Sequence, residues 1–274
     1  TKTYVKGLGD FGPQNLEGRN LRFGIREHAM TAVVNGMALH GGFLPYGSTF
    51  FVFADYMRPG IRLAALMQIP SLYVLTHDGI GVGEDGPTHQ PVEHLASLRA
   101  MPGVTIYRPA DGNEAAGAWE WALEQNGPVI FVLSRQKLAT LDPSVRVKAK
   151  RGAYVVSEVQ NPQGIIVATG AEVWVALDAQ KELEAKGISI NVVSFPSWEA
   201  FDEQSVSYQE SVFPQGLPVL SVEAGATFGW ERYADDMIGL DRFGASAPAN
   251  ILFDVFGFTA DHVAERMVLL LESK

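Results

Sequence analysis

Residues 81–91, GVGEDGPTHQP, place an acid and a histidine in a segment too rich in turn formers to be a strand or a helix interior. Its glycines allow the backbone to approach a ligand closely. Pro91 suits the first turn of a helix, and an amphipathic helix is expected after it. Asp85 and His89 are therefore predicted to be held at a helix entrance. They either shape that entrance or, as their clustering with His77 favours, face a ligand.

Two further candidate positions lie at the ends of predicted strands. LTHDG, residues 75–79, places His77 and Asp78 at the carboxyl end of one strand, and Arg135 ends another. Open parallel sheets bind ligands at this edge. His77 could equally be a structural histidine. Arg135 either binds a phosphate through its guanidinium group or is a solvated edge residue.

An acid and a group of aromatic residues form the remaining candidates. Glu27 lies at the start of a predicted helix, where the helix dipole favours a carboxylate and where acid–base chemistry is also feasible. Phe50, Phe53 and Tyr56 recur every three residues, roughly on one helical face. Such a face either packs into the core or forms a flat wall for a planar heterocycle.

Alternating helices and strands must position these residues. The predicted helices cover 26–40, 50–69 with a kink or a break at Pro59, 112–126, 171–186 and 260–272. The predicted strands cover 71–77, 103–109, 127–135, 164–170, 188–197 and 217–225, with a short extended piece at 43–46. This alternation indicates an α/β fold with two mainly parallel sheets flanked by helices. We expect domains at 1–138 and 152–274 joined by a linker at 139–151, with the first domain lacking its opening strand and helix.

Composition limits the class of protein. The chain has 274 residues, 47% of them hydrophobic, a net charge of −10 and no cysteine. Disulfides and thiolate sites are excluded, and a reducing, cytoplasmic location is expected. The acidic balance argues against nucleic acid and anionic membranes as partners. No apolar run approaches the roughly 20 residues of a membrane helix.

Several stretches together resemble the transketolase family. GIREHAM, LTHDGIGVGEDGPTHQPVEHLASLRAMP and RPADGNEAAGAW look like its pyrimidine-binding domain, and SFPSWEAFDEQ, SVEAG and RFGASAPAN look like its C-terminal domain. The resemblance covers essentially the whole chain, and the GEDGPTHQPVE run is highly specific. It implies reversible transfer of a two-carbon ketol group from a ketose phosphate to an aldose phosphate in the pentose phosphate pathway, with thiamine diphosphate as cofactor.

The resemblance also implies a role for each candidate. Glu27 matches the glutamate that hydrogen-bonds the aminopyrimidine ring, and Phe50, Phe53 and Tyr56 match the aromatic residues around that ring. His89 matches a catalytic histidine beside the reactive centre that also contacts substrate. Asp85 would accept a hydrogen bond from a sugar hydroxyl, and His77 and Arg135 match contacts to the substrate phosphate.

The family's diphosphate-binding domain is not recognisable in the chain. That domain holds Mg²⁺ or Ca²⁺, so no metal ligand is assigned here. We expect an incomplete chain that is inactive alone, a missing half that stays bound, and a homodimer with sites at the subunit interface. The β chain of a 2-oxo acid dehydrogenase and a noncatalytic transketolase-like module remain alternatives.

Overall fold

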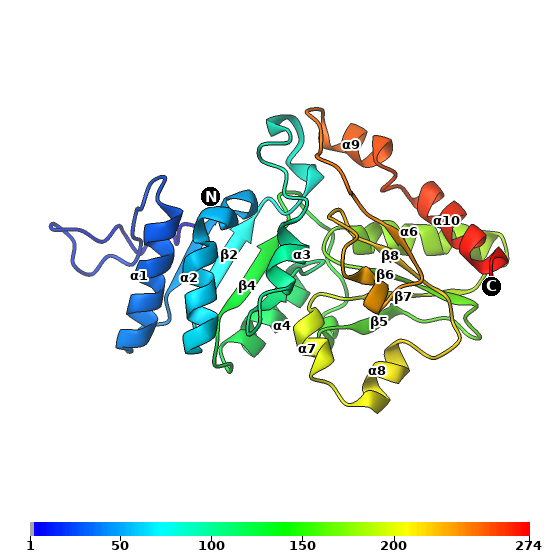
Figure 1. The fold of residues 1–274 in the computed structure, drawn as a ribbon, viewed down its shortest axis with the longest axis horizontal. Helices are drawn as coiled ribbons and strands as arrows, with labels where there is room; N and C mark the ends of the chain where they lie inside the picture. Colours follow the sequence, from blue (N-terminus) through cyan, green and yellow to red (C-terminus); the bar gives the residue numbers. More distant parts are fainter. Residues whose placement is uncertain (1–2) are drawn as a thin grey trace.

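The computed structural model describes residues 3–274 and contains two sheets with helices packed on them (Figure 1). The first sheet has the strand order β1-β2-β4-β3, and each neighbouring pair is parallel. Its strands are β1 (Tyr46–Phe50), β2 (Leu72–Thr76), β3 (Thr105–Tyr107) and β4 (Val129–Leu133). Four consecutive residues of both β2 and β4 are buried, because the two central strands are covered on both faces.

Four helices pack on this sheet, and their apolar side chains form a core together with those of the strands. They are α1 (Glu27–His40), α2 (Ala54–Met67), α3 (His94–Arg99) and α4 (Gly112–Ala122). Val34 of α1 and Met57 and Ile61 of α2 pack in one cluster with Tyr73 and Leu75 of β2. The apolar spacing of the helices thus fixes them against the strands that carry the candidate residues at their ends.

The helical run predicted over 50–69 is confirmed for most of its length, but its start and the break at Pro59 are wrong. Phe50 ends β1, a short 3-10 helix η1 (Phe51–Phe53) follows, and α2 then continues without a break past Pro59. Pro59 removes only the helical hydrogen bond to the carbonyl of Asp55. Both residues are exposed, so water can replace that partner. The extended piece predicted at 43–46 lies a few residues later, as β1.

The second sheet has the order β5-β7-β6-β8-β9, with β5 antiparallel and the other pairs parallel. Its strands are β5 (Tyr154–Ser157), β6 (Gly164–Ala168), β7 (Ile190–Ser194), β8 (Val219–Val222) and β9 (Asp236–Ile238), and its helices are α6 (Glu172–Ala185), α7 (Trp198–Asp202), α8 (Val206–Val212), α9 (Ala249–Val255) and α10 (Ala260–Glu272). The apolar runs predict the three central strands but neither edge strand, because β5 and β9 are only partly buried and less uniformly apolar. The α/β class with two mainly parallel sheets is confirmed.

Two segments outside the sheets, residues 139–151 and 3–26, differ in their secondary structure. The segment 139–151, predicted as a linker, contains α5 (Val145–Ala149), which packs against α4. The segment 3–26 runs beside α1 and has only isolated bridges, from Asp10 to Asn20 and from Gly12 to Asn15. The prediction that no opening strand is present covers residues 1–20, of which 1 and 2 lie outside the described part. The proposed domain boundaries stay a prediction.

Buried charges join the two halves of the chain. Arg108, which follows β3, donates to Asp78 Oδ2 from Nε at 3.0 Å and lies 2.8 Å from the same oxygen through Nη2. The same guanidinium group pairs with Glu172, the first residue of α6. Arg99 of α3 donates to both oxygens of Glu223 at 2.7 and 2.8 Å. All five side chains are at most 7% exposed, so these pairs act as a dry ionic contact between the sheets.

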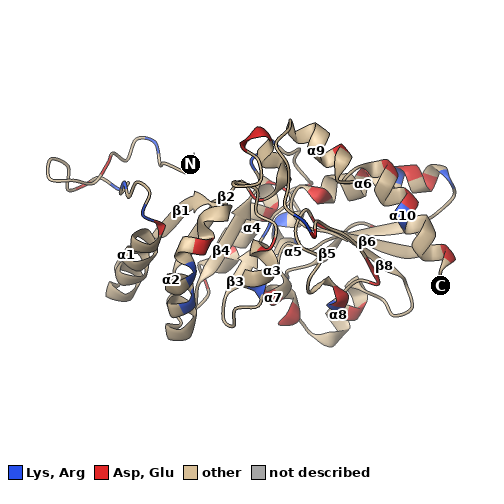
Figure 2. Ribbon diagram, turned by 45° about the horizontal axis from the view of Figure 1, so that its top comes forward, with Lys and Arg blue, Asp and Glu red and all other residues tan. Residues whose placement is uncertain are grey.

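Part of the acidic charge lies on helices far from the strand ends of the first sheet. Figure 2 shows Asp and Glu on α6, α8 and α10, three of the helices of the second sheet. The net charge of −10 therefore does not by itself define the field at the strand ends of the first sheet. Within residues 3–274, no helix is both long enough and apolar enough to span a membrane.

A glycine after α5 provides a test of the packing between 139–151 and the second sheet. Gly152 has φ +85°, and a Cβ there would lie 2.3 Å from Phe201 N and 2.4 Å from Ser197 O. We expect Gly152→Ala to lower the free energy of unfolding by about 2 kcal/mol more than Gly187→Ala, because overpacking adds to the backbone cost. Gly187 has a similar φ of +77° and open space around it. Equal losses in chemical denaturation would contradict this packing.

Candidate functional site

Glu27 begins α1 and faces the end of β1. Its carboxylate is half-buried, and Thr49 Oγ1 donates to Glu27 Oε1 across 3.4 Å. The helix dipole favours a negative charge at this first helical position. Thr49 directly precedes Phe50, so Glu27 contacts β1 one residue before the first of the predicted aromatic residues. The sequence predictions did not include Thr49. Its place directly before Phe50, a predicted site residue, could have indicated it.

The three predicted aromatic side chains form a row, but not on one helix. Phe50 ends β1, Phe53 belongs to η1 and Tyr56 lies in α2. The rings of Phe50 and Phe53 are nearly parallel, with centroids 6.3 Å apart and an angle of 13°. Phe53 and Tyr56 are also 6.3 Å apart, at 32°. Tyr56 is 63% exposed, so the row is an open aromatic surface and not part of the closed core.

Both predicted histidines contact this row. His77 stacks on Phe50 with ring centroids 3.6 Å apart, and its Nδ1 lies 2.9 Å from Thr76 Oγ1. His89 meets Phe53 edge to face at 5.6 Å and Phe50 at 6.4 Å. The two imidazoles, which are twelve residues apart in sequence, thus share one aromatic surface.

The backbone and the surroundings of His77 are unusual. Its φ is +65°, a region that non-glycine residues rarely occupy and that often marks functional sites. Burial lowers the pKa of His77, and the charge of Arg135 lowers it further, while Asp85 and Asp78 act in the opposite direction. The neutral imidazole therefore dominates at neutral pH. It can donate from one nitrogen and accept at the other.

Asp85 and Arg135 are exposed, and both act electrostatically on His77. Arg135 comes two residues after β4, and Asp85 ends the 3-10 helix η2 (Ile80–Asp85). Asp78, unlike Asp85, is buried, and its carboxylate is paired with Arg108.

The order of the strands explains why these groups converge. Phe50, His77 and Arg135 come at or just after the carboxyl ends of β1, β2 and β4, which are adjacent and parallel. In a parallel sheet these ends meet at one edge, the usual position for ligands. The arrangement offers two carboxylates, two imidazoles, a guanidinium group and an aromatic surface to a polar, planar or anionic ligand.

Asp55, Glu93 and His94 could hold a metal ion by residue type. The imidazole of His94 is buried, with Nε2 3.3 Å from Asp55 Oδ2 and Nδ1 3.8 Å from Glu93 Oε2. The two carboxylates thus approach different ring nitrogens. Neither ring nitrogen makes a hydrogen bond in the described part of the chain, so the imidazole lies between two acids without being fixed by either.

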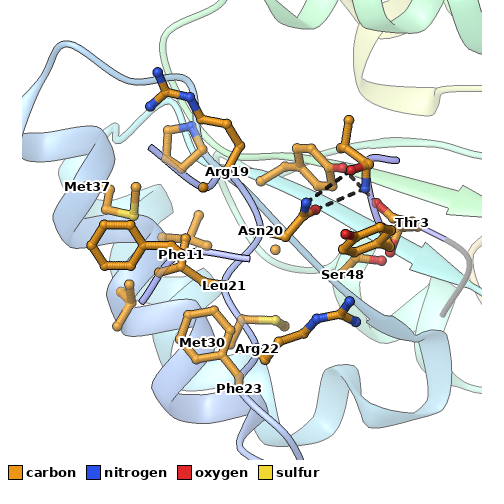
Figure 3. Close-up of a pocket in the computed structure, with 18 of the residues that line it drawn as sticks. Thr3, Phe11, Arg19, Asn20, Leu21, Arg22, Phe23, Met30, Met37 and Ser48 are labelled. Atoms are coloured by element: carbon orange, nitrogen blue, oxygen red, sulfur yellow. Dashed lines mark hydrogen bonds between the residues drawn. The ribbon is translucent and has the colours of Figure 1, made fainter. Parts of the chain in front are cut away.

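A cavity of about 1030 Å³ lies beside the candidate site, between the segment 3–24, α1 and residues 43–49. Figure 3 shows Phe11 beside Met37 and Phe23 beside Met30 on its apolar wall. Thr49 lines it, but none of the predicted site residues does. The cavity therefore belongs to the contact between the segment 3–24 and α1 and does not coincide with the chemically equipped strand ends.

Two family models match the chain. One is described as "Transketolase, pyrimidine binding domain" and matches residues 1–140, and the other as "Transketolase-like TK C-terminal domain" and matches 152–259. The chain belongs to the transketolase family. A transketolase of Geobacillus stearothermophilus is 52% identical over 98% of this chain and 42% of its own length. The chain thus spans less than half of that relative.

Solved structures agree with this membership. A transketolase from Pichia stipitis, described as a complex with sedoheptulose 7-phosphate, has a TM-score of 0.96 and 46% identity over 99% of this chain and 41% of that one. A more distant chain, described as "Split gene transketolase, inactive beta4 tetramer", has a TM-score of 0.77 and 26% identity over 92% of this chain and 84% of that one. Membership of the transketolase family confirms the resemblance drawn from GEDGPTHQPVE. The roles of the individual residues stay predictions.

Proposed function

We propose that this chain supplies the pyrimidine-binding and C-terminal domains of a transketolase. The reaction is transfer of a two-carbon ketol group from a ketose phosphate to an aldose phosphate. The observation that carries the proposal is the convergence of Glu27, the aromatic row and two histidines at one sheet edge in a chain of this family. Membership of the family favours this reading over a β chain of a 2-oxo acid dehydrogenase.

The residues fit the pyrimidine ring of thiamine diphosphate. The partly open row of Phe50, Phe53 and Tyr56 offers apolar contact to a flat ring, and Glu27 is a half-buried acceptor beside Thr49, the residue before Phe50. When bound, this cofactor supplies the nucleophilic carbon and the electron sink that the chemistry requires. Glu27 would hold a proton shared with a ring nitrogen. His89 would accept or return a proton at a substrate hydroxyl.

The remaining polar groups suit a sugar phosphate. His77 and Arg135 would bind the phosphate, because a guanidinium group and an imidazole can both donate to its oxygens. Asp85 would accept a hydrogen bond from a sugar hydroxyl. Relatives described as complexes with sedoheptulose 7-phosphate and fructose 6-phosphate support this class of substrate.

Activity would require partners. We propose that a diphosphate-binding domain holds Mg²⁺ or Ca²⁺ and that a second copy of this chain completes a homodimer. Large apolar side chains around the segment 3–26 and residues 43–46 support a covered surface: Leu16, Ile25 and Leu44 are 73, 95 and 69% exposed. A noncatalytic role is the competing proposal. The likeness to a chain described as "Split gene transketolase, inactive beta4 tetramer" supports it.

The deciding measurement is a ketol-transfer assay with thiamine diphosphate, Mg²⁺, xylulose 5-phosphate and ribose 5-phosphate. We expect transfer when a diphosphate-binding half is present and none by this chain alone. Calorimetry should accordingly detect no tight, Mg²⁺-dependent binding of thiamine diphosphate to the chain alone. The chain combined with a diphosphate-binding half is called the complemented protein below. Its failure to transfer the ketol group would favour the noncatalytic role.

A further inference from the structure

The loop that carries Asp85 and His89 contacts a segment from the C-terminal half of the chain, the half that forms the second sheet. This segment, residues 242–250, leads into α9, and Figure 1 shows it beside the loop that follows β2. Ser246 Oγ donates to the carbonyl of Glu84 at 2.5 Å. Gln90 Nε2 donates to the carbonyls of both Gly83 and Ala245 at 2.9 Å.

Glycines on both sides allow this close contact. A Cβ on Gly244 would lie 1.8 Å from Gln90 Oε1, so a larger residue there would displace the glutamine. Gly86, with φ +76°, would bring a Cβ to 3.2 Å from Ser246 Cβ. The loop and the segment 242–250 are therefore fitted to each other and do not merely lie in proximity.

The contacts flank the two functional residues without using their side chains. Glu84 precedes Asp85 directly, and Gln90, which is 2% exposed, follows His89 directly. The loop is thus fixed at both ends of the span 85–89, while Asp85 remains exposed and His89 half-buried. Fixing the backbone removes conformations that a substrate would otherwise have to exclude on binding.

We propose that residues 242–250 form a clasp that positions Asp85 and His89, with Gln90 and Ser246 as positioning residues. The part that concerns substrate rests on the proposed ketol transfer. The clasp itself is a physical property of this chain. It gives the C-terminal half a role in the site although it contributes no side chain to the chemistry.

Hydrogen exchange on the chain tests the clasp directly. Ser246→Ala should make the amides of 84–91 exchange about fivefold faster, since one neutral hydrogen bond typically shifts a local opening equilibrium by about that factor. Ser211→Ala is the matched control, because Ser211 is also exposed and its hydroxyl also donates to a backbone carbonyl, that of Tyr208. Ser246→Thr keeps the hydroxyl and should restore slow exchange. Equal exchange in the Ser246→Ala and Ser211→Ala proteins would overturn the clasp.

Kinetics of the complemented protein tests the positioning role. Ser246→Ala should raise the KM for the sugar phosphate by about three- to tenfold with a smaller change in kcat, and Ser246→Thr should reverse this. Faster exchange with an unchanged KM would overturn the positioning role. If the wild-type protein transfers no ketol group, the proposed function fails, and the exchange experiment still decides whether the clasp exists.

Discussion

Replacing Glu27 with alanine is expected to reduce kcat for ketol transfer by about 10³-fold in the complemented protein. The carboxylate is the acid at the start of α1 that accepts a hydrogen bond from Thr49, one residue before Phe50. If it shares a proton with the cofactor's ring, the substitution removes the group that exchanges that proton. Glu27→Gln should be almost as inactive, because an amide keeps the size and loses the proton affinity.

The loss should not come from unfolding. Glu27 is only half-buried, so the thermal midpoint of the chain should change little. Glu124→Ala, at an exposed position after α4, is the matched control and should retain the wild-type rate. Wild-type turnover in the Glu27→Ala protein would sink the assignment of the acid, whatever the fate of the other residues.

The second large effect concerns the buried ions between the sheets. Glu223→Gln is expected to lower the free energy of unfolding by about 3–5 kcal/mol at pH 7, because it leaves Arg99 buried without its anion. Glu223 accepts two hydrogen bonds from Arg99, one from Thr169 at 2.6 Å and one from Trp230 at 3.0 Å. Glu210→Gln, on the exposed face of α8, should cost almost nothing.

The effect should depend on pH in a defined direction. Burial alone would raise the pKa of Glu223, but Arg99 and Arg108 outweigh it and lower the pKa to about 2. Because this is below the value of about 4.3 in the unfolded chain, the stabilisation is present above about pH 5 and is lost as the pH falls toward 2. The difference between wild type and the Glu223→Gln protein in urea unfolding should therefore shrink from pH 7 to pH 3.

A neighbouring acid, Glu172, belongs to the same buried cluster and also responds to pH. Two guanidinium groups, Arg99 and Arg108, face three carboxylates, those of Asp78, Glu172 and Glu223, so one negative charge is in excess. Burial raises the pKa of Glu172 in spite of Arg108. Its effect on stability therefore opposes that of Glu223, and it changes in size when Glu223 is replaced, because Arg108 interacts with both acids. A pH-independent difference would mean that Glu223 is not the ionised partner.

Local pattern was sufficient for much of the fold. The apolar runs at 71–77 and 127–135 predicted β2 and β4, because a strand covered on both faces must be apolar along its length. It was not sufficient at 50–69, where a spacing of three residues suggested one helix. Phe50, Phe53 and Tyr56 come close together although they belong to a strand, a 3-10 helix and an α-helix.

By itself, the sequence determined the two-sheet α/β class, the family and the residue types of the candidate site, since these follow from hydrophobic period and from runs such as GEDGPTHQPVE. Only the tertiary structure decided which side chains meet. Three contacts show this: His77 stacks on Phe50, Asp78 is buried against Arg108, and residues 242–250 contact the loop of Asp85 and His89. Each joins positions far apart in the chain. Such contacts follow from strand order and from the docking of the two sheets, and no local period records either.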